Sequence, residues 1–260
     1  MGGKLSSQQH AAIVSSYLDG SSMTELATSF GVSQPSVKGL LVRRGIPLRN
    51  KVITVRANAF DLLDEEACYW IGFLFADGSV AAPRGSGQAS LSVGLSLRDV
   101  QHLIKLRAFL GCNGAISESP VRNTCQFSVR SNRLASRLLE LGRYGPAIHA
   151  DLAASVDFWR GAFDGDGTLG RYRVPPTERY RSQVGMVGSL MMMEGFSIFL
   201  ESHGFRRLRP RPTKNIYQVA TTGAPAEGIV SLLYEKPLVA LTRKHETAKR
   251  VLASRPTTIN

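Results

Sequence analysis

Apolar and polar positions follow two different periods along this chain, and together they predict helices separated by short strands. Residues 69–76 and 158–163 are largely apolar, as expected of helices that enter a core. Residues 88–95 change between polar and apolar at every step, which is the pattern of a strand with one face against a core. The pattern therefore predicts a mixed α+β chain.

From about residue 61 the same order of elements occurs twice. The first cycle predicts a helix ending at Asp77, short strands after it, strands over 88–95, 114–117 and 124–130, and helices over 99–110 and 132–141. The second predicts a helix ending at Asp166, strands over 168–173, 183–188, 207–212 and 216–221, and helices over 191–203, 226–234 and 242–253. We therefore expect two αββαββα repeats, over 61–150 and 151–260, each with helices on the apolar face of a sheet.

Residues 6–44 predict a small all-α unit of three helices. Ser7, Ser22 and Ser33 precede the three helical runs and are the expected N-caps. Ala27, Gly31 and Val37 resemble the helix-turn-helix pattern, in which a small residue lets two helices approach, glycine takes the turn and valine anchors the second helix. We expect a DNA-binding helix-turn-helix domain over 1–46, with a generic three-helix bundle as the alternative, and a basic linker over 47–60.

Composition narrows the class of partner. The 260 residues carry 32 Lys and Arg against 20 Asp and Glu, a net charge of +12, which favours a polyanion such as nucleic acid. No apolar run approaches the roughly 20 residues of a membrane span, so we expect no membrane partner. Cys68, Cys112 and Cys125 form no paired motif, which favours buried thiols in a cytoplasmic (bacterial or phage-encoded) or otherwise reducing intracellular location.

The most informative pattern is a short run that occurs twice. Tyr69–Ser79 and Phe158–Thr168 each contain an internal glycine and end in a small residue, Asp, Gly and a hydroxyl residue. If the two helices pack together, Asp77 and Asp166 meet at adjacent helix ends, where two carboxylates repel each other unless a divalent cation binds them. The alternative for either copy alone is a helix-to-strand turn, in which Asp-Gly is common.

These two runs resemble the LAGLIDADG motif of homing endonucleases, in the form in which one chain carries two motifs. The resemblance covers about residues 61–255, and the helix-turn-helix unit matches an accessory module of some members. It implies a pseudo-twofold duplication, a saddle of strands in the DNA major groove, and cleavage of both strands with Mg²⁺ (or Mn²⁺). It also implies a monomer that hydrolyses double-stranded DNA at a long asymmetric site.

The resemblance assigns roles to particular residues of this chain. Catalysis and metal binding fall on Asp77 and Asp166, with backbone carbonyls of Ala76 and Gly165 as further metal ligands. Phe75 departs from the motif, which usually has an Asp there, whereas the second copy keeps Asp164.

An assisting basic residue is expected late in each repeat. In the second repeat Lys244 and Arg243 match that place. The first repeat has no lysine there, so either His149 or Arg143 substitutes or the two half-sites are unequal, and we expect unequal cleavage of the two strands.

The remaining predictions concern DNA contacts and rival functions. Side chains that hydrogen-bond bases or phosphates lie on the polar faces of the strands, in the second helix-turn-helix helix and in the basic segments. They are Gln34, Ser36, Lys38, Arg43, Arg44, Arg49, Lys51, Gln88, Ser90, Ser92, Gln126, Ser128, Arg130, Arg171, Arg173, Gln183, Arg207, Arg209, Arg211, Lys214 and Tyr217. The alternatives are a non-catalytic transcriptional regulator of the same fold and an intron RNA maturase.

Overall fold

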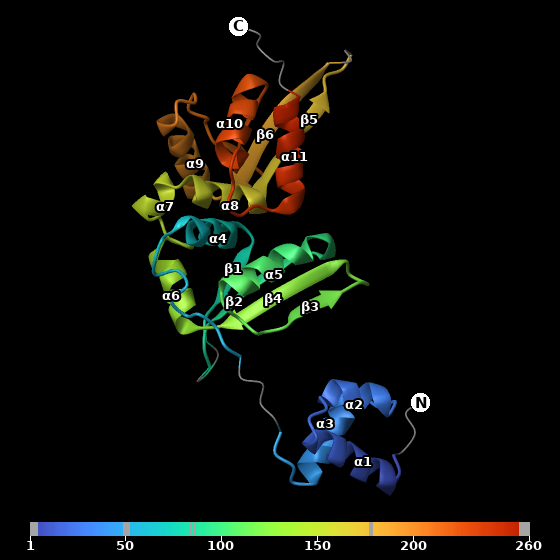
Figure 1. Ribbon diagram of the computed structural model, residues 1–260. Coiled ribbons are helices and arrows are strands. Elements are labelled where there is room, and N and C mark those ends of the chain that lie inside the picture. Colours follow the sequence, from blue (N-terminus) through green and yellow to red (C-terminus); the bar gives the residue numbers. More distant parts are fainter. Residues whose placement is uncertain (1–4, 49–52, 84, 86, 177–178, 255–260) are drawn as a thin grey trace. The chain divides into compact units, whose positions relative to one another are not determined.

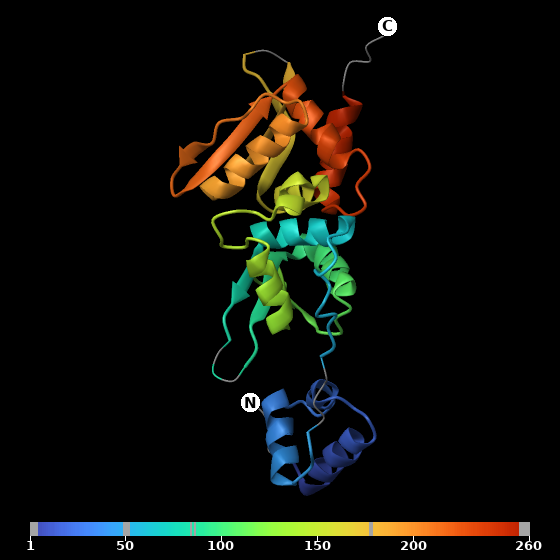
Figure 2. The same cartoon turned by 90° about the vertical axis from the view of Figure 1, so that its left-hand side faces the viewer.

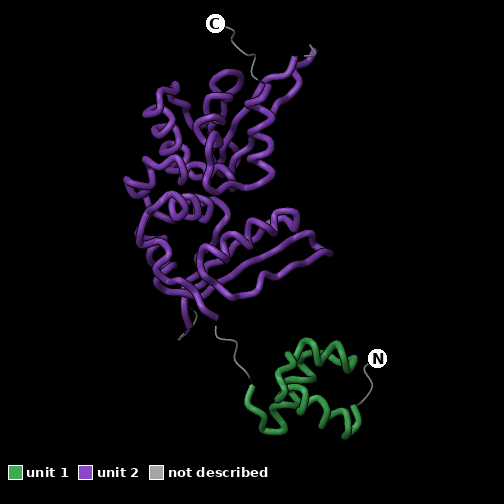
Figure 3. Tube along the Cα trace, in the orientation of Figure 1, with its two compact units in different colours: residues 1–52 green, residues 53–260 purple. Residues whose placement is uncertain are grey.

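The computed structural model describes residues 5–48, 53–83, 85, 87–176 and 179–254, and the chain forms two compact units, Met1–Val52 and Ile53–Asn260 (Figure 3). The boundary falls within the segment 47–60 that was predicted as a linker. Arg49 and Lys51 lie outside the described residues. Residues 53–60 of that segment belong to the second unit, where Phe60 is fully buried and Arg56 Nη2 donates to the Phe109 carbonyl at 2.6 Å, whereas Leu48 packs on the core of the first unit.

The first unit consists of three helices. They are α1 (Ser7–Leu18), α2 (Met23–Ser29) and α3 (Gln34–Arg43). Their core contains Ile13, Leu26, Ala27, Val37 and Leu41, all buried. The three-helix unit thus forms where the pattern predicted it, and its helix-turn-helix identity stays a prediction.

Serine caps start these helices. Ser22 and Glu25 form the reciprocal capping box, and the Ser33 hydroxyl accepts from the Ser36 amide at 3.3 Å. The first cap is Ser6, not Ser7 as predicted, because Gln9 lies three residues after Ser6 and completes a second capping box.

The second unit contains the two repeats, which run in the same order (Figure 1). The first is α4 (Glu65–Ala76), β1 (Gly78–Ala81), β2 (Ser90–Ser96), the 3₁₀ turn η1 (Leu97–Asp99), α5 (Val100–Phe109), β3 (Ile116–Ser119), β4 (Thr124–Arg130) and α6 (Asn132–Glu140). The second is α7 (Ala150–Ala154), α8 (Val156–Asp166), β5 (Gly167–Arg173), β6 (Tyr180–Gly188), α9 (Leu190–Ser202), β7 (Arg211–Thr213), β8 (Ile216–Thr222), α10 (Ala224–Tyr234) and α11 (Thr242–Ala253).

Sheet topology confirms the duplication. Among the described residues each repeat forms a four-stranded antiparallel sheet, in the order β1-β2-β4-β3 and β5-β6-β8-β7. The strand predicted over 114–117 lies at Ile116–Ser119, and two larger differences have a physical cause. The strand predicted over 207–212 is reduced to Arg211–Thr213, at an edge where Pro210 and Pro212 lack amide donors. Helix α7 was not predicted, because five residues are too few to reveal a helical period.

The core lies between the sheets. Figures 1 and 2 show α4 and α8 at the middle of this unit, with one sheet on either side. Trp70 and Trp159 occupy equivalent positions in these helices, and both are fully buried in one hydrophobic cluster that extends through both repeats. No helix in the described part of the chain has the length and apolar character needed to cross a membrane.

Candidate functional site

Helices α4 and α8 approach each other through their backbones. A Cβ atom on Gly72 would lie 1.9 Å from the Phe158 carbonyl oxygen, and one on Gly161 would lie 2.0 Å from the Tyr69 carbonyl oxygen. These positions admit no side chain, so glycine is what allows the helices to meet this closely. The same contact brings the C-terminal ends of the two helices together.

The two predicted acids lie at these ends. Asp77 is the C-cap of α4 and Asp166 is the last residue of α8. A Cβ atom on Gly165 would lie 3.4 Å from Asp77 Oδ2, so the Asp77 carboxylate lies against the final turn of α8. The structure therefore brings together the two ends of the duplicated motif, as the sequence predicted.

The pKa values of the two carboxyl groups are both raised at these helix ends. Burial, followed by the neighbouring charge of Asp166, raises the pKa of Asp77 from 3.8 to about 6. Burial also raises the pKa of Asp166, while Lys244 and Arg143 act in the opposite direction. Both acids are thus partly buried with their charges incompletely compensated by protein groups.

Such a pair fits a hard divalent cation. Mg²⁺ is commonly bound by one or two carboxylates, with phosphate oxygens and water completing the octahedron. Within the described residues, no group of three or more His, Cys, Asp and Glu side chains is arranged to hold a metal ion. Asp77 and Asp166 could therefore hold a cation only with help from carbonyl oxygens, water or substrate, which suits Mg²⁺ better than Zn²⁺.

Lys244 reaches the same region from α11. Its Nζ atom donates to the carbonyls of Phe163 and Gly167, both at 2.6 Å, and lies 3.5 Å from the Gly165 carbonyl. The side chain is buried, and burial lowers the pKa of Lys244 from 10.5 to about 8, against the opposing effect of nearby Asp164. The predicted lysine thus lies at the end of α8, beside Asp166.

Arg143 is the counterpart of Lys244 in the first repeat. Its guanidinium donates to the carbonyls of Phe75 and Gly78, which flank Asp77 as the lysine's partners flank Asp166. Burial lowers the pKa of Arg143, and the charge of Asp166 raises it. His149, the other candidate, is half-exposed and lies 3.8 Å from Asp151 instead.

The different spacing of the basic residues in the two repeats explains why the sequence did not decide between Arg143 and His149. Arg143 follows Asp77 by 66 residues, whereas Lys244 follows Asp166 by 78. Arg143 comes from the turn after α6, whereas Lys244 comes from α11, a helix without an equivalent in the described part of the first repeat. Only the carbonyls to which each side chain donates identify the two as counterparts.

Arg243 has a different environment from Lys244. Its Nε atom donates to Asp99 Oδ2 at 2.9 Å, so the side chain joins α11 to the first repeat. Asp99 is buried, and Arg243 is about half exposed. Of the two basic residues predicted for catalysis, the structure brings Lys244 to the carbonyls around Asp166 and pairs Arg243 with a carboxylate.

Asp164 is a site residue whose partners the sequence did not reveal. It is fully buried and accepts hydrogen bonds from Tyr69 Oη at 2.7 Å, Tyr234 Oη at 2.5 Å and the Leu241 amide at 2.7 Å. Tyr69 belongs to the other motif helix and also contacts His102 Nε2 at 3.0 Å. In the first repeat Phe75 stands at the equivalent position and packs on Phe158.

The outward face of the first sheet is polar but weakly charged. Register places Ser90 opposite Arg130, Ser92 opposite Ser128, and Gly94 opposite Gln126, all facing away from the core. The predicted contacts Ser90, Ser92, Gln126, Ser128 and Arg130 therefore share one face, and Gln88 is exposed just before β2. Arg130 is the one charged member of this set.

The predicted residues of the second sheet divide between two faces. Gln183 and Arg211 face outward, with Arg181 also on that face. Arg171 and Arg173 lie in the opposite register of β5 but are exposed, because this hairpin extends past the core. Tyr217 is half-buried against the core.

Other predicted basic residues are exposed. Arg207 and Arg209 lie between α9 and β7, where Arg207 Nη1 is 3.4 Å from Glu201 Oε2, and Lys214 is in the β7–β8 turn. In the first unit, the exposed members of the set are Gln34, Ser36, Lys38, Arg43 and Arg44.

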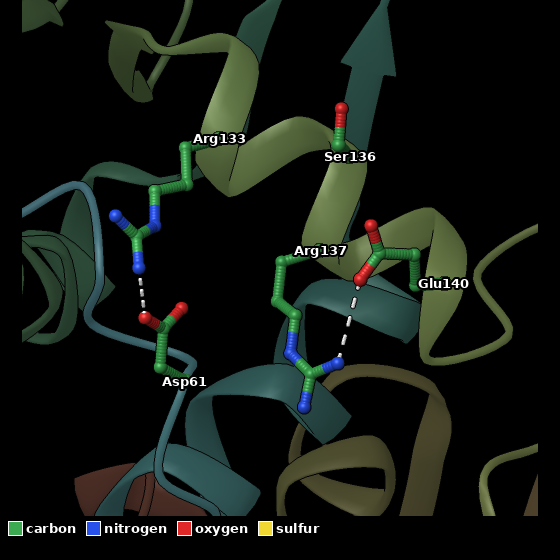
Figure 4. Close-up of a pocket in the computed structure, with 5 residues that line it drawn as sticks. All are labelled: Asp61, Arg133, Ser136, Arg137 and Glu140. Carbon is green, nitrogen blue, oxygen red and sulfur yellow. Dashed lines mark hydrogen bonds and ion pairs between the residues drawn. The ribbon is translucent and has the colours of Figure 1, made fainter.

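A separate pocket lies at α6 (Figure 4). Its charged side chains pair with one another, Arg133 with Asp61 and Arg137 with Glu140, and Arg137 Nε also donates to the Phe60 carbonyl at 3.2 Å. These contacts attach the segment before α4 to α6. None of the predicted site residues lines this pocket, so we assign it a structural role.

Comparison with known proteins identifies the fold. No protein-family model and no curated protein matches the chain. Solved structures do match. Structures of the LAGLIDADG meganuclease I-AabMI bound to uncleaved DNA, of the LAGLIDADG homing endonuclease I-LtrWI bound to target DNA, and of the meganuclease I-SmaMI bound to uncleaveable DNA give TM-scores of 0.54, 0.52 and 0.54.

These similarities extend over most of each protein while the sequences differ. The identities are 11%, 13% and 12%, the matches cover 74%, 73% and 74% of this chain, and they cover 90%, 91% and 88% of the respective neighbours. In this chain the two repeats have the same strand order and are joined through the helices that lead to Asp77 and Asp166. The chain therefore has the fold of the LAGLIDADG homing endonucleases.

Proposed function

We propose that this protein is a sequence-specific, Mg²⁺-dependent (or Mn²⁺-dependent) endonuclease that cuts both strands of double-stranded DNA as a monomer. The observation that carries the proposal is the meeting of Asp77 and Asp166 at adjacent helix ends, each beside a basic side chain, half-buried Arg143 for Asp77 and buried Lys244 for Asp166. The DNA-bound meganucleases of the same fold support it. One matching structure is of I-SmaMI bound to its uncleaved DNA target in the presence of calcium ions.

Each repeat would supply one carboxylate and one basic side chain to its half of the site, Asp77 with Arg143 and Asp166 with Lys244. Asp77 and Asp166 would hold the cation, which when bound stabilises the attacking and leaving oxygens of the phosphodiester. The Ala76 and Gly165 carbonyls are the proposed additional ligands. Lys244 and Arg143 would place positive charge beside the acids, where negative charge develops on the phosphate.

DNA binding would use the outward faces of the two sheets. Antiparallel strands can lie in the major groove, where Gln and Arg side chains recognise base edges, and Arg and Lys side chains bind phosphates. The exposed basic residues of α3 favour additional contacts from the first unit outside the central site. The excess of 12 positive charges supports a polyanionic partner.

The decisive experiment starts from a library, because the target sequence is unknown. Wild-type protein would be incubated with randomised duplex DNA and MgCl₂, and cleaved fragments would be recovered and sequenced. The recovered site would then be tested with Asp77→Asn and Asp166→Asn. Glu140→Gln serves as the matched control, because it also removes one carboxylate but lies in the pocket at α6.

The expected result is Mg²⁺-dependent cutting by wild type and Glu140→Gln, with no double-strand cutting by either Asp variant. Tight, sequence-selective duplex binding without cutting would favour the transcriptional regulator. Selective binding of structured intron RNA over duplex DNA would favour the maturase. Cutting that survives both Asp substitutions would contradict the assigned site.

A further inference from the structure

Asp164 is the most deeply buried carboxylate among the described residues, and three hydrogen-bond donors surround it. Both oxygens are used: Oδ1 accepts from Tyr234, and Oδ2 accepts from Tyr69 and from the Leu241 amide. Leaving a carboxylate this deep without partners would be strongly unfavourable, so the three donors must hold their positions around it. They come from α4, from α10 and from the residue that precedes α11.

The Leu241 contact determines where α11 begins. Leu241 is the N-cap of α11, and its side chain makes no capping hydrogen bond. Its carbonyl accepts from the Lys244 and His245 amides, both at 3.0 Å, and its own amide donates to Asp164. Asp164 therefore fixes the first turn of α11 from outside the helix.

The residue fixed by that turn is Lys244. It follows Leu241 by three positions, and its ammonium group reaches the Phe163 and Gly167 carbonyls on either side of Asp164 and Asp166. Asp164 on α8 thus holds the start of α11, and Lys244 on α11 donates in turn to carbonyls at the end of α8. A change at Asp164 would move the lysine without touching it.

The first repeat lacks this device. Phe75 replaces the buried carboxylate, and Arg143 reaches its carbonyls from a turn in which Tyr144 has a φ of 62°. A matched substitution at Phe75 therefore changes the equivalent motif position without changing the α11 contact.

We infer that Asp164 is a positioning residue that sets the place of Lys244 through the Leu241 amide, and so acts on one of the two half-sites. The half-site part rests on the proposed nuclease function. The positioning part concerns only the protein and can be measured without DNA.

The DNA-free test is the acylation of lysine in the full chain at one fixed pH, followed by peptide mass spectrometry. The probe is N-hydroxysulfosuccinimide acetate. Lys249 lies on the same helix with 57% of its side chain exposed, so the ratio of Lys244 to Lys249 acylation reports the position of Lys244 and not the amount of reagent. Lys244, 6% exposed, starts with a low ratio.

Asp164→Val removes every acceptor and should raise this ratio roughly tenfold, the factor expected for the loss of a hydrogen bond to a charged group. Asp164→Asn retains an acceptor oxygen of the same shape and should restore most of the protection. Phe75→Leu should leave the ratio unchanged. An unchanged ratio in folded Asp164→Val, or an equal rise in Phe75→Leu, overturns the positioning role. A rise in Asp164→Asn as large as in Asp164→Val also overturns it, because that is the result expected when only the charge that raises the pKa of Lys244 is lost.

Leu241→Pro provides a second, independent variant if Asp164→Val does not fold. Proline removes the amide hydrogen that Asp164 accepts, keeps the carbonyl, and suits the φ of −69° at this residue. It also replaces the buried leucine side chain, so Leu241→Ala, which keeps the amide, is its control and should show a smaller rise. The expected result for Leu241→Pro is again a rise of roughly tenfold in the ratio. Continued protection of Lys244 in this variant would contradict the inference.

The half-site test uses the DNA site recovered from the library. Lys244→Met first identifies the strand that depends on the lysine, and Asp164→Val should slow nicking of that strand while sparing the other. Equal slowing of both strands overturns the half-site part. If wild type cuts no DNA, the nuclease proposal fails and the acylation result still decides the positioning role.

Discussion

The two repeats share one backbone plan and differ in the groups placed around it. Both form a four-stranded antiparallel sheet with the same strand order, and both motif helices lead to an Asp followed by a Gly. The second repeat adds a buried carboxylate and a lysine on a helix, whereas the first has Phe75 and an arginine on a turn. Equivalent positions of the basic group can therefore be reached by different routes through the chain.

Charge separates the repeats as well. Residues 61–150 contain nine Lys and Arg against eight Asp and Glu, and residues 151–260 contain 16 against 10. The outward face of the first sheet is rich in serine, whereas that of the second carries Arg181 and Arg211. Shared architecture with unequal chemistry predicts two half-sites that can be distinguished experimentally.

The largest expected difference concerns the two basic groups. Lys244→Met and Arg143→Met should each slow nicking of one strand by about 10²-fold, because each removes a positive charge that lies beside one acid and is at least partly shielded from water. Separate labels on the two strands of the recovered site would measure the rates. If each variant slows both strands equally, the repeats do not divide the strands between them.

Wild-type protein should itself cut the two strands at different rates, because an arginine on a turn and a buried lysine offer unlike groups to the phosphates. The measurement is the first-order nicking of each strand of a supercoiled plasmid that contains the site. Equal rates would show that the structural asymmetry has no consequence for the reaction.

Glycine substitutions test what the repeats share. Gly72→Ala and Gly161→Ala each place a methyl group about 2 Å from a carbonyl oxygen of the opposite helix, so each should lower the free energy of unfolding by about 3 kcal/mol. Gly94→Ala is the control, because nothing lies within 4 Å of the added atom. Urea unfolding should show similar losses of unfolding free energy for the two variants. A marked difference between them would show that the two helices do not contribute equally to the interface.

Replacing one acid should stabilise the metal-free protein. The folded-state pKa of Asp77 is raised to about 6, so its ionisation opposes folding fully above pH 6 and not at all below about pH 4. Asp77→Asn should therefore unfold with a free energy about 2 kcal/mol larger than wild type at pH 8, and the difference should disappear as the pH falls to 4.

MgCl₂ provides the control for that comparison. Added Mg²⁺ should stabilise wild type more than Asp77→Asn and so narrow the gap at pH 8, because a ligand that binds only the folded state stabilises it by mass action. A variant less stable than wild type at pH 8 without metal would contradict the repulsion between the two acids.

The smallest effect is expected in the salt dependence of DNA binding. Arg181→Gln and Arg211→Gln on the second sheet should each reduce the slope of log K against log salt concentration by about 1, if each contacts a phosphate. Ser92→Ala and Ser128→Ala on the first sheet should leave the slope unchanged. Equal slopes in all four variants would show that the second sheet is not the stronger electrostatic anchor.

Local pattern accounts for most of the fold and for the two acids. The alternation in 124–130 predicts β4 with its bounds, and the repeated Asp-Gly runs locate the ends of α4 and α8. These features can be predicted because the hydrophobic period and the turn each depend on only a few neighbouring residues. Edge strand β7 is less predictable, because three residues next to prolines carry little periodic signal.

Parts of the site required the tertiary structure. Arg143 meets its carbonyl partners 65 and 68 residues away, and Asp164 meets Tyr69 across 95 residues. No spacing rule connects such positions, since the intervening loops can change length without moving the ends. The sequence alone therefore predicted that the two acids meet and that Lys244 lies near them, but it left open which basic side chain lies near Asp77.

The backbone contact between α4 and α8 has a consequence for how such a protein can diverge. At Gly72 and Gly161 the touching atoms are carbonyls and α-carbons, which every amino acid possesses. Side chains elsewhere can then be exchanged without changing the separation of the two helix ends. A fold joined in this way can retain its geometry in chains that share only 11–13% of their residues, and each repeat can acquire its own surface chemistry independently.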